Sequence, residues 1–111
     1  MKIEKVKIES VKGTKHYIMI TTLINTVLDV NENGDIKRKL KSGKWKTIAN
    51  KVNHNKGYNV ILIDKKQFMR STIVAYTYLN LNINDNIYLI YHLDGDKLNN
   101  AVSNLELVIK Y

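Results

Sequence analysis

The C-terminal part of the chain contains a group of residues whose types and order suggest chemistry. His92 is followed by the pair Asp94-Gly95, then by Asn99-Asn100, and then by Asn104. An Asp-Gly turn followed by asparagines is typical of a loop whose backbone groups bond to side-chain amides. Such a loop can fix one histidine, and a fixed neutral imidazole can take a proton from water. The same residues are compatible with a braced surface loop in which His92 is idle, so spacing alone leaves both interpretations open.

A second candidate site is a basic segment in the N-terminal half. Residues 1–60 contain 13 lysines and arginines against 5 acidic residues and so carry the whole net charge of +8, whereas residues 61–111 contain 5 of each. No acidic residue interrupts the segment from Lys37 until Asp64. A concentration of positive charge of this kind favours contact with nucleic acid over a merely solvated surface. The residues predicted to contact nucleic acid are Lys37, Arg38, Lys39, Lys41, Lys44, Trp45, Lys46 and Lys51.

Length and composition limit what these sites can belong to. A chain of 111 residues can bury one core, which excludes a multi-domain enzyme. The absence of cysteine excludes disulfides and thiolate-bound zinc. No apolar stretch approaches the roughly 20 residues that span a bilayer, and residues 1–10 lack the apolar core of a signal peptide. We therefore expect a cytoplasmic protein without membrane contact.

The elements that must position the two sites follow from local patterns. Asn33-Gly34 is a strong hairpin signal because both turn positions tolerate positive φ. Ser71 is predicted to cap a short helix over 72–79, in which apolar residues share one face. Strands rich in β-branched residues are predicted at 17–22, 27–30, 35–40, 44–48, 58–63, 67–69 and 87–91. The predicted fold class is α+β, with an N-terminal antiparallel β region and one short helix.

The segment around His92 resembles the HNH endonuclease family, especially its small phage and intron homing endonucleases. The resemblance lies in His92, Asp94-Gly95, Asn99-Asn100 and Asn104-Leu105, at the family's spacing. Upstream, residues 30–36 resemble the family's first hairpin and residues 56–58 its Gly-Tyr strand, while 71–75 keep only the Val-Ala of its helix. The resemblance covers about residues 28–108.

The resemblance implies roles for individual residues. His92 corresponds to the general base and Asn104 to the residue that braces the loop. The family's ββα-metal motif also needs an Asp or His immediately before the base, where this chain has Tyr91, and a second ligand on a helix that would lie beyond Tyr111. A neutral tyrosine hydroxyl is a poor ligand for a hard divalent cation. We therefore expect a truncated motif with a vestigial His92, no metal site and no cofactor, with Mg²⁺ needed only by an active nuclease.

The sequence thus predicts a single HNH-like domain over 1–111, with a basic DNA-contact region at 1–55 and a degenerate motif at 56–111. Its expected function is double-stranded DNA binding by a protein derived from a phage-type homing endonuclease, without nuclease activity. One alternative is an active metal-dependent nickase with His92 as general base. Another is a phage-encoded inhibitor that binds an acidic host protein and acts in the host cytoplasm. His16 and His54 are isolated in the sequence and are assigned no site role.

Overall fold

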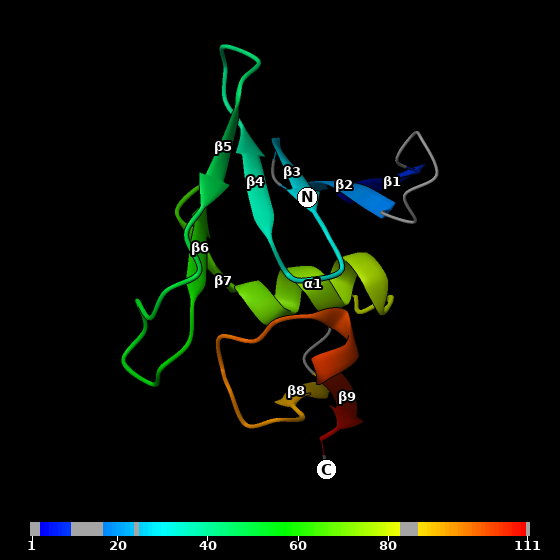
Figure 1. Cartoon of the computed structure of the whole chain (residues 1–111), viewed down its shortest axis with the longest axis vertical. Helices are drawn as coiled ribbons and strands as arrows, with labels where there is room; N and C mark the ends of the chain where they lie inside the picture. The colour runs from blue at the N-terminus through cyan, green and yellow to red at the C-terminus, as the bar shows by residue number, and fades with distance from the viewer. Residues whose placement is uncertain (1–2, 10–16, 24, 83–86, 111) are drawn as a thin grey trace.

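The computed structural model describes residues 3–9, 17–23, 25–82 and 87–110 (Figure 1). Within these ranges the chain forms strands, one α-helix and one short 3-10 helix. In chain order they are β1 (Ile3–Glu9), β2 (Tyr17–Leu23), β3 (Thr26–Val30), β4 (Ile36–Lys39), β5 (Trp45–Ile48), β6 (Val60–Ile63), β7 (Lys66–Met69), α1 (Arg70–Tyr78), β8 (Tyr88–His92), η1 (Val102–Asn104) and β9 (Leu105–Ile109). The predicted α+β class is confirmed. No helix in the described ranges is long and apolar enough to cross a membrane.

The strands form one antiparallel meander and two separate hairpins. β1 to β5 pair in sequence order, β6 pairs with β7, and β8 pairs with β9. The predicted Asn-Gly hairpin is present between β3 and β4, where Gly34 has a φ of 85°. The Oδ1 of Asn31 accepts hydrogen bonds from the backbone N–H groups of Asn33 (2.9 Å) and Asp35 (3.0 Å). This side chain therefore fixes the β3–β4 turn (residues 31–35) in one conformation.

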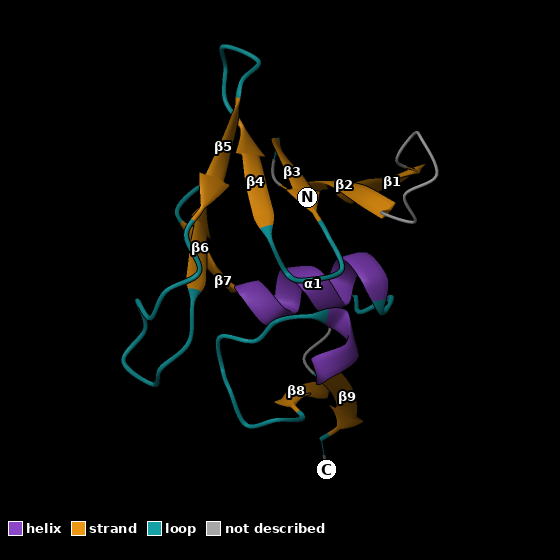
Figure 2. Cartoon of the chain, viewed as in Figure 1, coloured by secondary structure: helices purple, strands orange, loops and turns teal. Residues whose placement is uncertain are grey.

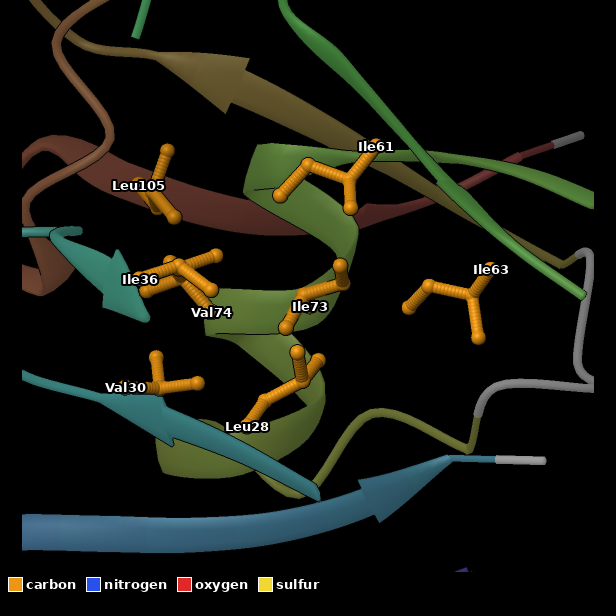
Figure 3. Packing of buried hydrophobic residues seen from close by; sticks show 8 residues of the cluster. All are labelled: Leu28, Val30, Ile36, Ile61, Ile63, Ile73, Val74 and Leu105. Carbon is orange, nitrogen blue, oxygen red and sulfur yellow. The ribbon is translucent and has the colours of Figure 1, made fainter. Parts of the chain in front are cut away.

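The helix α1 lies between the five-stranded sheet and the β8–β9 hairpin (Figures 1 and 2). The side chains that meet there are apolar and buried, as Figure 3 shows. They are Leu28, Val30, Ile36, Ile61, Ile63, Ile73, Val74 and Leu105. Each contributes about 1.5–3 kcal/mol on burial, so one core joins the N-terminal sheet to the C-terminal hairpin.

Two local predictions differ from the structure. Ser71 does not cap α1, because the helix begins at Arg70, two residues before the predicted start, and Ser71 is buried inside its first turn. The N-cap residue is Met69, which makes no side-chain cap hydrogen bond, and the backbone N–H of Arg70 donates to the carbonyl of Asn59 at 3.0 Å. The second difference is β1, for which no strand was predicted although its alternation of charged and apolar residues has the two-residue period of a strand.

Candidate functional site

The loop that connects β8 to β9, residues 92–104, is held together by its own asparagine side chains; we call it the His92 loop. The backbone N–H of Leu93 bonds to the carbonyl of Asn104 at 2.8 Å and closes the loop. The Oδ1 of Asn104 accepts the N–H of Asp94 (3.0 Å), and its Nδ2 donates to Asp94 Oδ1 (2.9 Å) and to the carbonyl of Asn99 (2.8 Å). Asn104 thus connects Asp94 to Asn99 within the loop.

The carboxylate of Asp94 is fully engaged inside this loop. Its Oδ2 accepts the Nδ2 of Asn99 at 2.7 Å, and its Oδ1 accepts the backbone N–H of Asp96 at 2.8 Å in addition to Asn104. The hydrogen bond from Asn99, followed by those from Asp96 and Asn104, lowers the pKa of Asp94 below its usual 3.8. Asp94 therefore acts as an ionised anchor of the loop, with both carboxylate oxygens accepting hydrogen bonds from it.

His92, at the end of β8, is half-buried and held in one orientation. Its Nε2 lies 2.8 Å from the Oδ1 of Asn100. Because the Nδ2 of Asn100 donates to the carbonyl of Leu98, the Oδ1 accepts the Nε2–H of His92. The neutral imidazole then has its lone pair on Nδ1, and the ring of Tyr58 packs beside it with centroids 6.2 Å apart. The imidazole is thus oriented as a proton acceptor must be.

The β3–β4 turn packs directly against the His92 loop. A Cβ on Gly34 would lie 2.6 Å from the backbone oxygen of Asn100, so only glycine fits between the two segments. The backbone N–H of Val102 donates to the carbonyl of Glu32 at 2.8 Å. These contacts hold the β3–β4 turn against Asn100, the residue whose side chain is hydrogen-bonded to His92.

Arg70, the first residue of α1, is a buried connector that the sequence analysis did not identify. Its Nη1 donates to the carbonyl of Gly34 (2.9 Å), its Nη2 to that of Ile48 (2.7 Å), and its Nε to Asn59 Oδ1 (2.8 Å). Burial lowers its pKa, and the negative charge of Asp35 opposes this shift. An arginine after a strand gives no sequence signal of burial, because arginine is usually exposed.

Tyr91, at the position of the family's first metal ligand, lies on the opposite side of β8 from His92. Neighbouring strand residues alternate in direction, and Tyr91 is 52% exposed while His92 is half-buried. Within the described ranges no group of three His, Cys, Asp or Glu side chains could hold a metal ion. Since Asp94 is engaged in the loop and Tyr91 is a weak donor, the described residues do not fit a divalent cation.

The basic segment is divided between the two sides of the β4–β5 hairpin. Lys37 and Lys39 on β4 share one side with Trp45 on β5, and the Nζ of Lys39 lies 5.9 Å from the centroid of the Trp45 ring. All three side chains are exposed, and we call this group the basic face. Asp29 of β3, which pairs with Lys37, adds one acidic group on this side; burial raises its pKa, and Lys37 opposes this shift.

The remaining predicted contact residues are arranged differently. Arg38 and Lys46 pair with each other on the side opposite the basic face. Arg38 donates a hydrogen bond from Nη2 to the carbonyl of Leu62 and is therefore tied to β6. Lys41 and Lys44 are exposed in the connection between β4 and β5, and Lys51 is exposed beyond β5. The structure thus brings Lys37, Lys39 and Trp45 together and directs Arg38 away from them.

A small cluster beside the His92 loop was also missed. The Nζ of Lys97 donates to the carbonyl of Lys56 at 2.7 Å and lies 4.8 Å from the centroid of the Tyr58 ring. The ring of His54 also packs edge-on against Tyr58, with centroids 6.0 Å apart. His54 therefore lies near His92 through Tyr58, although the two are distant in sequence. His16 lies outside the described residues, as does part of the loop expected over 80–86.

The α+β fold described above is similar, over most of the chain, to that of a known class of protein. Among solved structures the chain is similar to that of an HNH homing endonuclease, which confirms the resemblance seen in the sequence. That protein is I-HmuI, which binds and cleaves DNA. The TM-score is 0.53 and the identity 26%, over 74% of this chain and 46% of the I-HmuI chain. The chain thus spans about half the length of I-HmuI. No family model and no curated protein matches it.

Proposed function

We propose that this chain is a DNA-binding protein related to HNH homing endonucleases, and that its own residues do not cut DNA. The observation that carries DNA binding is the basic face, where Lys37, Lys39 and Trp45 lie exposed side by side on two paired strands. Two cations can neutralise neighbouring phosphates, and the indole opposite Lys39 adds contact area. The likeness to I-HmuI, which binds DNA, supports the same function.

The lack of cleavage is supported by the donor set around His92. A nuclease of this kind needs a divalent cation to stabilise the leaving oxygen, and the cation needs several oxygen or imidazole ligands. Tyr91 supplies a neutral hydroxyl and points away from His92, while both oxygens of Asp94 already accept hydrogen bonds. The His92 loop then serves the fold rather than hydrolysis.

DNA binding is tested by titrating a fluorescent duplex at several salt concentrations. Replacing Lys37 and Lys39 with glutamine should weaken binding and reduce the log–log salt slope by about 1.8, at about 0.9 for each lost phosphate contact. The matched control replaces Lys65 and Lys66, which are exposed at the β6–β7 turn on another part of the molecule. Equal slopes for the two double variants, or no binding of the wild-type chain at low salt, would refute the assignment.

A second candidate function, metal-dependent nicking, is favoured by the orientation of His92, whose Nε2 is held by Asn100 at 2.8 Å. The test is incubation of supercoiled plasmid with the protein and Mg²⁺ or Mn²⁺. We expect no nicking, and Tyr91→Asp alone should not produce it, because one carboxylate is too few ligands. Nicking by the wild-type chain that disappears in His92→Ala would establish the second candidate instead.

A further inference from the structure

Lys97, in the His92 loop, is an exposed lysine whose ammonium group is held in one place. Its Nζ donates to the carbonyl of Lys56 at 2.7 Å and lies 4.8 Å from the centroid of the Tyr58 ring. Its methylene chain runs beside Gly57, where an added Cβ would lie 3.6 Å from the Cδ of Lys97. An ammonium group has three N–H donors, and the carbonyl of Lys56 takes one of them. The others can reach an anion in solution, and the order of the side chain lowers the entropy that is lost when the anion binds.

The peptide group of Lys56 holds a second donor beside Lys97. The backbone N–H of Lys56 donates to the Nδ1 of His54 at 3.1 Å. The neutral His54 ring therefore carries its proton on Nε2, which can donate a hydrogen bond. The side chain of Lys56 is itself exposed and adds a second ammonium group. We call His54, Lys56 and Lys97, together with the ring of Tyr58 that both His54 and Lys97 contact, the Lys97 cluster.

The Lys97 cluster continues the basic segment of the N-terminal half. The chain that leads from β5 to β6 carries Lys56 and belongs to the stretch without acidic residues that begins at Lys37. It lies beside the His92 loop (Figure 1), where the Nδ2 of Asn50 donates to the carbonyl of Leu98 at 2.6 Å. The fold thus brings Lys97, which is distant in sequence, next to the last lysine of the basic segment.

The acidic residues of the His92 loop are engaged within the loop. Asp94 accepts hydrogen bonds from Asn99, from Asn104 and from the backbone N–H of Asp96. The Oδ1 of Asp96 accepts the backbone N–H of Leu98 at 2.9 Å. Within the described ranges neither carboxylate forms an ion pair with Lys97, whose ammonium group bonds to a neutral carbonyl instead. The positive charge of the cluster is therefore not cancelled by a direct partner.

We propose that the Lys97 cluster is a second contact for the phosphate backbone of a DNA duplex, separate from the basic face. The inference rests on the proposed DNA binding and adds a place on the protein where the duplex lies. Phosphate oxygens accept hydrogen bonds from ammonium groups and from imidazole N–H groups, which are the donors that the cluster presents. Contacts of this kind fix the orientation of a duplex without reading its sequence. The contact requires neither His92 nor a metal ion.

The first test is titration of a fluorescent duplex at several salt concentrations. Replacing Lys56 and Lys97 together with glutamine should reduce the log–log salt slope by about 1.8, at about 0.9 for each lost phosphate contact, and the matched pair Lys65 and Lys66 should leave it unchanged. Lys56→Gln alone should reduce the slope by about 0.9. Within the described ranges the side chain of Lys56 makes no hydrogen bond, so this variant does not disturb the fold. A slope that the Lys56 and Lys97 variants leave unchanged overturns the proposal.

The second test locates the duplex directly. Because the chain has no cysteine, a single introduced cysteine can carry a photoactivated cross-linker at a chosen position. Lys56→Cys and Lys39→Cys should both cross-link to DNA, whereas Lys65→Cys should not. Cross-linking from position 39 but not from 56, or equally from 56 and 65, overturns the second contact and leaves DNA binding by the basic face in place. A wild-type chain that binds no DNA at low salt, with no cross-link from either position, refutes the proposed function and this inference together.

Discussion

Replacing Asn104 with alanine tests whether the His92 loop is a structural unit or only a surface connection. Asn104 is 8% exposed, and its side chain makes hydrogen bonds to the backbone of Asp94, the carboxylate of Asp94 and the backbone of Asn99. Alanine removes all of them without introducing a new group. The N–H of Asp94 and the carbonyl of Asn99 then lose these partners, while the backbone bond between Leu93 and Asn104 still closes the loop.

The expected loss follows from these contacts. A polar group left unpaired on removal of its partner costs about 1–3 kcal/mol, and the cost is smallest where water can take the partner's place. Asp94 is exposed, so its carboxylate can turn to water, and most of the loss comes from the two backbone groups. We expect Asn104→Ala to lower the free energy of unfolding by about 2–4 kcal/mol. For a domain of this size the melting temperature should fall by about 10 °C or more.

The measurement is urea denaturation followed by circular dichroism, with His92→Ala as the comparison. His92 makes one side-chain hydrogen bond, to Asn100, so its loss should cost only about 1 kcal/mol. Asn104→Asp is a further control, because it places a second carboxylate against Asp94 and should regain stability as the pH is lowered and the pair takes up a proton. Equal losses for the two alanine variants, or a negligible loss for Asn104→Ala, would refute the bracing role.

Other predictions concern single contacts. Gly34→Ala should destabilise the protein by about 1–2 kcal/mol more than Gly43→Ala in the same urea assay, because both glycines have positive φ but only Gly34 abuts Asn100. Arg70→Met should lower the free energy of unfolding by about 3–5 kcal/mol, since the carbonyl of Gly34 and its other acceptors lose their donor in the interior. Because the folded-state pKa of Asp94 is lowered, its stabilising effect is complete above the usual 3.8 and is lost as the pH falls through the folded value. Asp94→Asn should therefore flatten the acid side of the stability profile measured by urea denaturation.

The parts of the fold that the sequence predicted are those set by neighbouring residues. The Asn33-Gly34 turn, the strands on either side of it and the asparagine-rich loop after His92 depend on local backbone preferences and on side chains a few positions away. Strand alternation also places Lys37 and Lys39 on one side of β4 and Arg38 on the other, a division that the predicted contact set did not make.

The parts that were missed depend on residues distant in sequence. Ser71 has the chemistry of a helix cap, but the helix already begins at Arg70, whose backbone N–H donates to the carbonyl of the distant Asn59. Arg38 belongs to the basic segment by composition, yet a carbonyl on β6 holds it on the other side of the sheet. Arg70 can be buried only because three separate segments supply hydrogen-bond acceptors to its guanidinium group. No local sequence pattern predicts that these segments come together.

The contact between Gly34 and Asn100 also bears on the moment at which the chain can fold in the cell. A protein leaves the ribosome from its N-terminus, so the β3–β4 hairpin emerges long before the segment that packs against it. Until Asn100 and Val102 have emerged, the turn lacks its partner and Leu28, Val30 and Ile36 lack part of their cover. This core therefore cannot close until the segment with Asn100, Val102 and Leu105 has been synthesised.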